Sequence, residues 1–211
     1  MNVGDASMQT NTNDARAEIM QSIRAHLAAS ASYDVLAAPL NLDPFKNPSP
    51  LALQQVVHLF KRNLELVDGH CIIARDNTEV AEAVNRITEG KRIAVSTSAF
   101  SKQDLFTVDV GITSAQAGIA ETGTLVLDSS VERNRLVSLV PPVHIAILDA
   151  SKIFLTLGEM LAALQSSAEL SPAVTFITGP SRTADIELTL TLGVHGPQQL
   201  YVIINEGASN A

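Results

Sequence analysis

The hydrophobic positions of this chain follow two spacings in turn, and each spacing predicts a different element. Apolar residues recur every three or four positions in 53–67, 80–87 and 153–164, which is typical of amphipathic helices. Short, continuously apolar runs predict buried strands at 71–74, 93–95, 108–112, 124–127, 144–148, 174–177 and 200–204. Such strands, separated by helices, indicate an α/β fold with an open, mainly parallel sheet and helices on both faces.

The first fifty residues have a different character. Residues 1–12 are small and polar, which predicts a loose tail. In 13–29 the residues Ile19, Ile23 and Leu27 form one helical stripe, and 37–50 contain four prolines, as in an extended linker. We therefore expect a flexible tail (1–12), a helix with a Pro-rich linker (13–50) and an α/β domain (51–211). The pattern leaves open whether the helix packs on that domain or on a partner protein.

Composition narrows the function classes. With 211 residues and 46% hydrophobic content the chain can bury a sizeable core. A net charge of −8 and the lack of a basic cluster argue against nucleic-acid binding. We find no signal-like leader and no apolar run as long as a membrane span, so we expect a cytoplasmic protein. The single cysteine, Cys71, predicts a buried thiol, and one thiol cannot hold an iron–sulfur cluster.

A turn with anion-binding character follows the strand predicted at 174–177. Its sequence over 179–183 is Gly-Pro-Ser-Arg-Thr, and we interpret the apolar run after it, which ends at Gly193, as a helix. The free N–H groups of a helix start, with Arg182 beside them, would bind a carboxylate or a phosphate. Asp185 also suits the dipole of a helix start, and Asp185 and Glu187 would point to different faces.

Four further residues are candidates for the site. Glu121 is the only acid within 111–124, a turn-like stretch of small residues; there it can act as acid, base or nucleophile, or can fix the turn by accepting backbone N–H bonds. His144 at a strand edge can serve catalysis or structure, and His195 lies in a turn able to face a crevice. Arg135 can reach an anion bound at the strand ends. The histidine spacing predicts no metal site, and no dinucleotide or P-loop motif occurs.

Together these residues predict a site for a small anion at the carboxyl ends of the strands. The catalytic candidates are Glu121, His144 and His195. The ligand-binding candidates are Thr122, Gly123, Arg135, Gly179, Pro180, Ser181, Arg182, Thr183, Asp185 and Glu187. In this interpretation Arg182 and nearby N–H groups hold the anion, and Glu121 orients it or moves a proton.

Three segments, 120–127, 135–144 and 179–197, resemble in their order the lactate utilization protein C family, whose domain is the LUD domain. The resemblance spans about residues 50–205. It implies a fold like that of the sugar-phosphate isomerase and CoA-transferase group (NagB/RpiA/CoA transferase-like). It also implies a non-redox subunit of a system that oxidises L-lactate to pyruvate, an iron–sulfur L-lactate dehydrogenase complex. The clusters would belong to partner proteins, and this chain would hold no cofactor.

Two other hypotheses remain open at this point. The chain could be a stand-alone transferase or ligase for a phosphorylated or CoA-linked substrate, with Glu121 as the covalent or general-base residue. It could instead be an interaction module that docks through the 13–29 helix and the Pro-rich segment.

Overall fold

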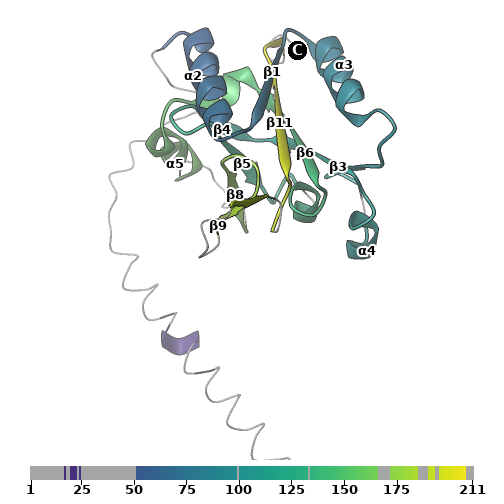
Figure 1. Cartoon of the computed structure of the whole chain (residues 1–211). Helices are drawn as coiled ribbons and strands as arrows, with labels where there is room; N and C mark the ends of the chain where they lie inside the picture. The colour runs from purple at the N-terminus through teal and green to yellow at the C-terminus, as the bar shows by residue number, and fades with distance from the viewer. Residues whose placement is uncertain are drawn as a thin grey trace, which may run out of the picture. The chain divides into compact units, whose positions relative to one another are not determined.

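The computed structural model describes residues 51–98, 100–132, 134–165, 172–184, 190–192 and 195–207, and residues 17, 20–22 and 24 of the N-terminal segment (Figure 1). The chain divides into two compact units, 1–40 and 41–211. The few described positions of the first unit are helical, and the predicted tail and Pro-rich linker lie outside the described residues.

The second unit is built on a five-stranded parallel sheet in the order β1-β11-β6-β3-β2. Its strands are β1 (His70–Ala74), β2 (Ile93–Val95), β3 (Val110–Ala115), β6 (Val143–Asp149) and β11 (Gln199–Asn205). Helix α2 (Leu53–Leu66) packs on one face of this sheet and helix α3 (Asn77–Thr88) on the other (Figure 1). The predicted α/β class, with a mainly parallel sheet flanked by helices, is therefore confirmed.

A second sheet, which the sequence analysis did not separate from the first, has the order β7-β4-β5-β8. Its strands are β4 (Ala117–Ile119), β5 (Thr124–Asp128), β7 (Ile153–Phe154) and β8 (Val174–Ile177), and β5 pairs antiparallel with both β4 and β8. Two predictions were wrong here. The stretch 113–119, expected to be a turn, completes β3 and forms β4. Residues 153–154, expected to start a helix, form β7.

Helix α5 (Leu157–Gln165) begins later than predicted because a capping box fixes its start. The Thr156 hydroxyl accepts the Glu159 N–H, and the Glu159 carboxylate accepts the Thr156 N–H, at 3.2 and 3.3 Å. A reciprocal pair of this kind satisfies N–H groups that have no partner inside a helix. Ile153 and Phe154 therefore lie before the helix, in an extended segment with high strand propensity.

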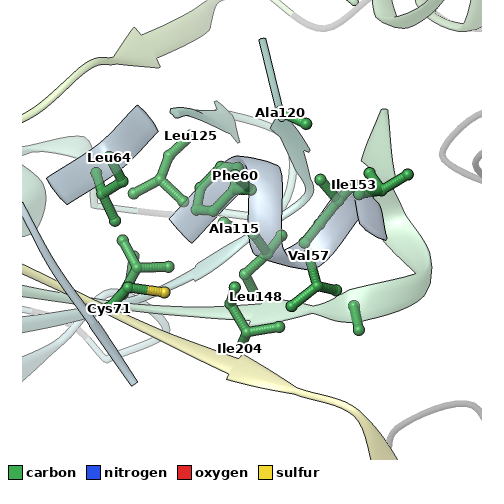
Figure 2. Packing of buried hydrophobic residues seen from close by; sticks show 14 of the residues in the cluster. Val57, Phe60, Leu64, Cys71, Ala115, Ala120, Leu125, Leu148, Ile153 and Ile204 are labelled. Carbon is green, nitrogen blue, oxygen red and sulfur yellow. The ribbon is translucent and has the colours of Figure 1, made fainter. Parts of the chain in front are cut away.

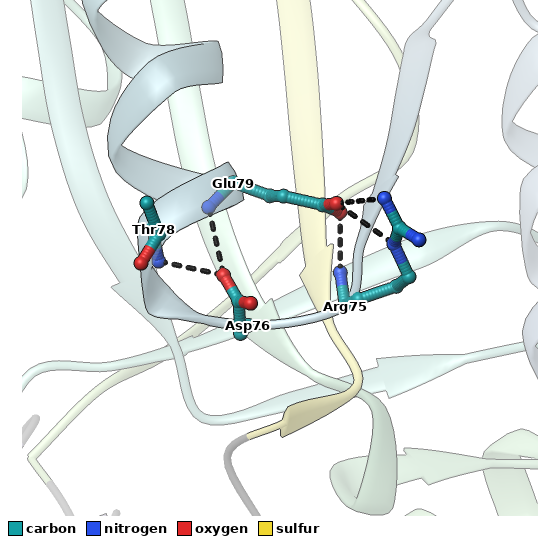
Figure 3. A network of polar contacts seen from close by, with 4 residues as sticks. All are labelled: Arg75, Asp76, Thr78 and Glu79. Carbon is teal, nitrogen blue, oxygen red and sulfur yellow. Dashed lines mark hydrogen bonds and ion pairs between the residues drawn. The ribbon is translucent and has the colours of Figure 1, made fainter.

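Helix α3 starts in a similarly defined way (Figure 3). The Asp76 carboxylate accepts the N–H groups of Thr78 and Glu79 at 2.8 and 2.9 Å. The Glu79 carboxylate in turn accepts the Arg75 N–H and pairs with its guanidinium, which lowers the pKa of Glu79. These local bonds fix where the chain leaves β1 and enters the helix. The remaining short elements are α4 (Lys102–Leu105) and the 3₁₀ turns η1 (Arg135–Ser138) and η2 (Ala150–Lys152).

The largest core cluster joins α2 to both sheets (Figure 2). Phe60 and Leu64 from α2 meet Leu125 of β5, Leu148 of β6 and Ile153 of β7, and all five are fully buried. Figure 2 also shows Cys71 at the edge of this cluster. Its side chain is buried, as predicted, and desolvation raises the pKa of the thiol to about 12. Cys71 is therefore a packing residue and not a reactive thiolate.

The segment after the Gly-Pro turn differs most from its prediction. Residues Arg182–Ala184 form β9 and Leu190–Leu192 form β10, and the two strands pair antiparallel. The expected helix is replaced by a β-ribbon. The physical reason is visible in the sequence, because from Ile186 to Leu192 every second residue is apolar, which is the period of a strand.

Candidate functional site

A crevice bordered by η1, β8 and two loops, 178–181 and 195–197, is the candidate site. One part of it, about 420 Å³, is lined by Ser129, Glu132, Asn134, Arg135, Leu136, Leu139 and Thr175. A second part, about 230 Å³, shares Leu139 and Thr175 and extends past His144 to the two loops. We refer to both parts together as the crevice. Leu139 and Thr175 line both parts, so the two parts are neighbours.

The crevice brings six of the predicted site residues together. Arg135 lies at one end, and His144, Gly179, Pro180, Ser181 and His195 line the other. Near the histidines the two loops are tied directly, because the Ser181 N–H donates to the carbonyl of Pro197 at 2.8 Å. This bond joins the loop after β8, in the second sheet, to the loop before β11, in the main sheet. It shapes the polar end of the crevice.

The Glu121 turn lies outside this arrangement. Glu121 is exposed, and its carboxylate accepts the N–H of Leu157 at 2.7 Å. Thr122 donates to or accepts from Thr124, and Gly123, with φ of 64°, lies against the backbone of α2. None of Glu121, Thr122 and Gly123 lines either part of the crevice. Their contacts match the structural alternative, in which the turn is pinned by backbone bonds.

Arg182 also points to a different place. Its guanidinium forms an ion pair with the carboxylate of Asp68, which follows α2 in the chain. This ion pair links the end of α2 to β9. The cavity on that side is lined by the acids Glu65 and Asp68, together with His70 and Pro180. A paired arginine beside two carboxylates is a poor anion site.

The helix N-terminus that we expected at this turn is replaced by β9, so its partial positive charge is not available to an anion. The side chain of Thr183, and the residues Asp185 and Glu187, lie outside the described residues. This correction moves the geometric centre of the candidate site from the Arg182 turn to the crevice.

His144 is the most deeply buried polar residue of the crevice. The sequence pattern placed it at the start of an apolar strand, and it is the second residue of the central strand β6, where it is fully buried. Its Nε2 shares a hydrogen bond of 2.8 Å with the Thr113 hydroxyl, and its Nδ1 has no partner among the described residues. Burial lowers the pKa of the imidazole to about 4. His144 is therefore neutral at pH 7.

Glu132 is a site residue that the sequence analysis missed. Its side chain is 2% exposed, and its Oε1 accepts the N–H of Ser114 at 3.0 Å. Its Oε2 is buried and has no hydrogen-bond partner among the described residues. A signal was present in the sequence, because 128–135 is a dense polar run directly after a buried strand, and such runs often line sites.

Two negative findings apply to the described part of the chain. No group of three or more His, Cys, Asp or Glu residues there is arranged to hold a metal ion. None of the helices in that part has the length and apolar content needed to cross a bilayer.

Comparison with known proteins identifies relatives of this chain. An uncharacterised protein of Neisseria meningitidis is 45% identical over 104 residues, which cover 48% of this chain and 45% of that protein. A lactate utilization protein C of Deinococcus radiodurans is 27% identical, with 92% of this chain and 97% of the relative covered. One from an Exiguobacterium strain is 40% identical, with 50% and 48% covered. The matched region thus spans about half of some relatives and nearly all of another.

The solved structures agree at the level of the fold. The crystal structure of a DUF162 family protein from Deinococcus radiodurans has a TM-score of 0.60 and 23% identity. It covers 74% of this chain and all of that protein. The LUD domain profile matches residues 97–205, the region that contains η1, His144 and both crevice loops. This chain therefore belongs to the LUD domain family.

Proposed function

We propose that this protein is a non-redox subunit of a lactate utilization system that converts L-lactate to pyruvate, and that it works with iron–sulfur partner proteins. The names of the Deinococcus and Exiguobacterium relatives support this role. The cysteine content supports the division of labour, because a single buried thiol cannot ligate a cluster, and electron transfer then falls to partners.

The crevice is the proposed binding site for a small anionic ligand of this system. Arg135 supplies an exposed guanidinium at its rim, and Ser181 and His195 supply polar groups at the other end. An arginine fork suits a carboxylate or a phosphate. The observation that carries this assignment is the meeting of Arg135, His144 and the 179–181 loop in one crevice.

Reconstitution tests the role in lactate oxidation. The full chain is combined with iron–sulfur proteins of a lactate utilization system, and lactate-dependent reduction of a dye is followed. We expect omission of this chain to lower the rate at least tenfold. An unchanged rate without the chain would contradict the proposed role.

A matched pair of variants tests the binding site. Arg135→Gln removes the rim cation and should weaken binding of the anion, measured by calorimetry, by about tenfold or more, since charge-assisted bonds contribute roughly 1.5–3 kcal/mol. Arg86→Gln changes an exposed arginine of α3, far from the crevice lining, and should bind like the unmodified protein. Equal affinities of the two variants would count against the crevice.

The alternative of a stand-alone transferase with Glu121 as its reactive group has less geometric support. Glu121 is exposed and its carboxylate accepts a backbone bond at the start of α5. A carboxylate that acts on a substrate needs a cavity beside it, and Glu121 does not line the crevice.

A further inference from the structure

We propose that Glu132 recognises a hydrogen-bond-donating group of the bound molecule, so that the crevice selects a small carboxylate or phosphate that also carries a hydroxyl or ammonium group. The inference rests on the proposed function only in that it uses the same crevice. It adds a specificity-determining residue, Glu132, for a ligand of that crevice.

Two hydrogen bonds hold Glu132 and its carboxyl group in place. The turn after β5 is closed by the Glu132 N–H, which donates to the carbonyl of Asp128 at 2.9 Å. Oε1 of Glu132 then accepts the N–H of Ser114 on β3. Both the backbone and one oxygen are therefore held, and the carboxyl group forms part of the crevice lining with Oε2 buried.

The second carboxylate oxygen of Glu132, Oε2, is left without a hydrogen-bond donor among the described residues. A buried carboxylate oxygen without a donor loses its hydration without compensation, which is unfavourable. Because none of the described residues supplies this donor, we consider water and a bound molecule as its source. A space of about 10 Å³ beside Thr113 and Glu132 fits at most one water, whereas the part of the crevice that Glu132 also lines has room for a ligand.

The charges around the crevice favour a ligand with two unlike parts. Glu132 would repel a bare anion placed against it, and Arg135 near it attracts one. The other end of the crevice contains the neutral His144 and the polar loops at 179–181 and 195–197. A ligand that satisfies all these groups has two unlike parts, an anionic group that faces Arg135 or the loops and a donor that faces Glu132.

Two matched pairs of probes test this selectivity by calorimetry on the full chain. L-lactate is compared with propionate, and glycerol 3-phosphate with propyl phosphate. Within each pair the anionic group is the same and only the hydroxyl donors differ. We expect at least one hydroxylated member to bind about tenfold or more tightly than its partner. Equal affinity within both pairs would overturn the inference, because a buried water would then be sufficient to satisfy Glu132.

A variant pair locates the effect. Glu132→Gln keeps an oxygen for the Ser114 N–H and replaces the charged Oε2 with a neutral amide, so the preference for hydroxylated probes should fall, because the charge-assisted bond to the hydroxyl is lost. Glu121→Gln makes the same chemical change at an exposed site outside the crevice and should retain the preference. An undiminished preference in Glu132→Gln would also overturn the inference. If Glu132→Gln fails to fold, the probe pairs on the unmodified chain still decide.

Different experiments test the proposed function and the role of Glu132, so one can be contradicted without the other. The reconstituted oxidation assay reports on the role in lactate utilization and does not depend on how Glu132 discriminates. The probe pairs report on recognition by the crevice and need no partner protein.

Discussion

At the scale of single residues, His144 makes the stability of the protein depend on pH. Burial lowers the pKa of its imidazole from 6.5 to about 4, so between these values the unfolded chain binds a proton that the folded chain does not. The free energy of unfolding therefore falls as the pH falls from about 6.5 to about 4. The shift corresponds to a loss of at most about 3 kcal/mol.

His144→Gln should flatten this dependence, because glutamine does not titrate. The measurement is urea unfolding of the variant and of the unmodified chain at several pH values from 7 to 4. His58→Gln is the control, since His58 is exposed on α2 and should leave the steep pH profile unchanged. Parallel profiles for His144→Gln and the unmodified chain would contradict the burial argument.

Sequence reasoning found His144 but missed Glu132, for a physical reason. His144 lies at the start of an apolar strand, which is a local signal that can be read from neighbouring residues. The burial of Glu132 depends on a turn that returns to β3 and meets the N–H of Ser114, 18 residues earlier in the chain. No local pattern reports such a contact, and an isolated acid in a polar run is usually exposed.

At the scale of elements, the wall of the crevice depends on the close approach of η1 to β3. A Cβ atom added to Gly111 would lie 1.9 Å from the carbonyl oxygen of Val137, so only glycine lets the two backbones meet. Gly111→Ala should lower the free energy of unfolding by about 2 kcal/mol or more and displace the segment that carries Arg135. Thermal unfolding and anion binding by calorimetry measure both effects.

Gly158→Ala is the matched control for that prediction. Gly158 lies in α5, and the nearest atom to an added Cβ is the Thr156 hydroxyl at 3.8 Å. Alanine favours a helix by up to about 1 kcal/mol over glycine, so this variant should be as stable as the original or slightly more so. A Gly111→Ala protein as stable as Gly158→Ala would show that η1 can move without cost.

The start of α5 gives Glu121 a structural role that can be measured. Its carboxylate accepts the N–H of the first residue of α5, where negative charge is favourable. Glu121→Ala should cost about 1 kcal/mol in the free energy of unfolding and leave binding in the crevice unchanged. Chemical denaturation and calorimetry check the two parts. Loss of ligand binding with unchanged stability would restore Glu121 as a site residue.

The elements predicted correctly are those with a strong single period. α2, α3 and the strands of the parallel sheet have one apolar face or a continuous apolar run, and these patterns survive in any tertiary context. The run after residue 184 mixes small, acidic and leucine residues, and its helix propensity concealed an alternation of period two. Its pairing as β9 and β10 then replaced the helix start that was expected beside Arg182.

At the scale of the whole molecule, the second sheet determines where the crevice lies. β8 pairs with β5, so that Thr175 lies opposite Leu127, and the loops that follow β8 reach the face of the main sheet that contains His144. A sequence of strands and helices does not reveal that some strands leave the main sheet. The division into two sheets depends on long-range pairing, which local periodicity does not encode.

The cores of this unit predict that it folds without the N-terminal segment. The core clusters of the described chain draw their members from residues 56–204. A chain that begins at Leu51 retains all of these residues, together with Glu132, His144 and Arg135. We expect its melting temperature to lie within a few degrees of that of the full chain, and its affinity for an anionic probe to be unchanged. Co-purification of both forms with the iron–sulfur proteins then separates two roles. If the N-terminal helix is the docking element, the shortened chain loses its partners and keeps its ligand, whereas an unfolded shortened chain would contradict the prediction.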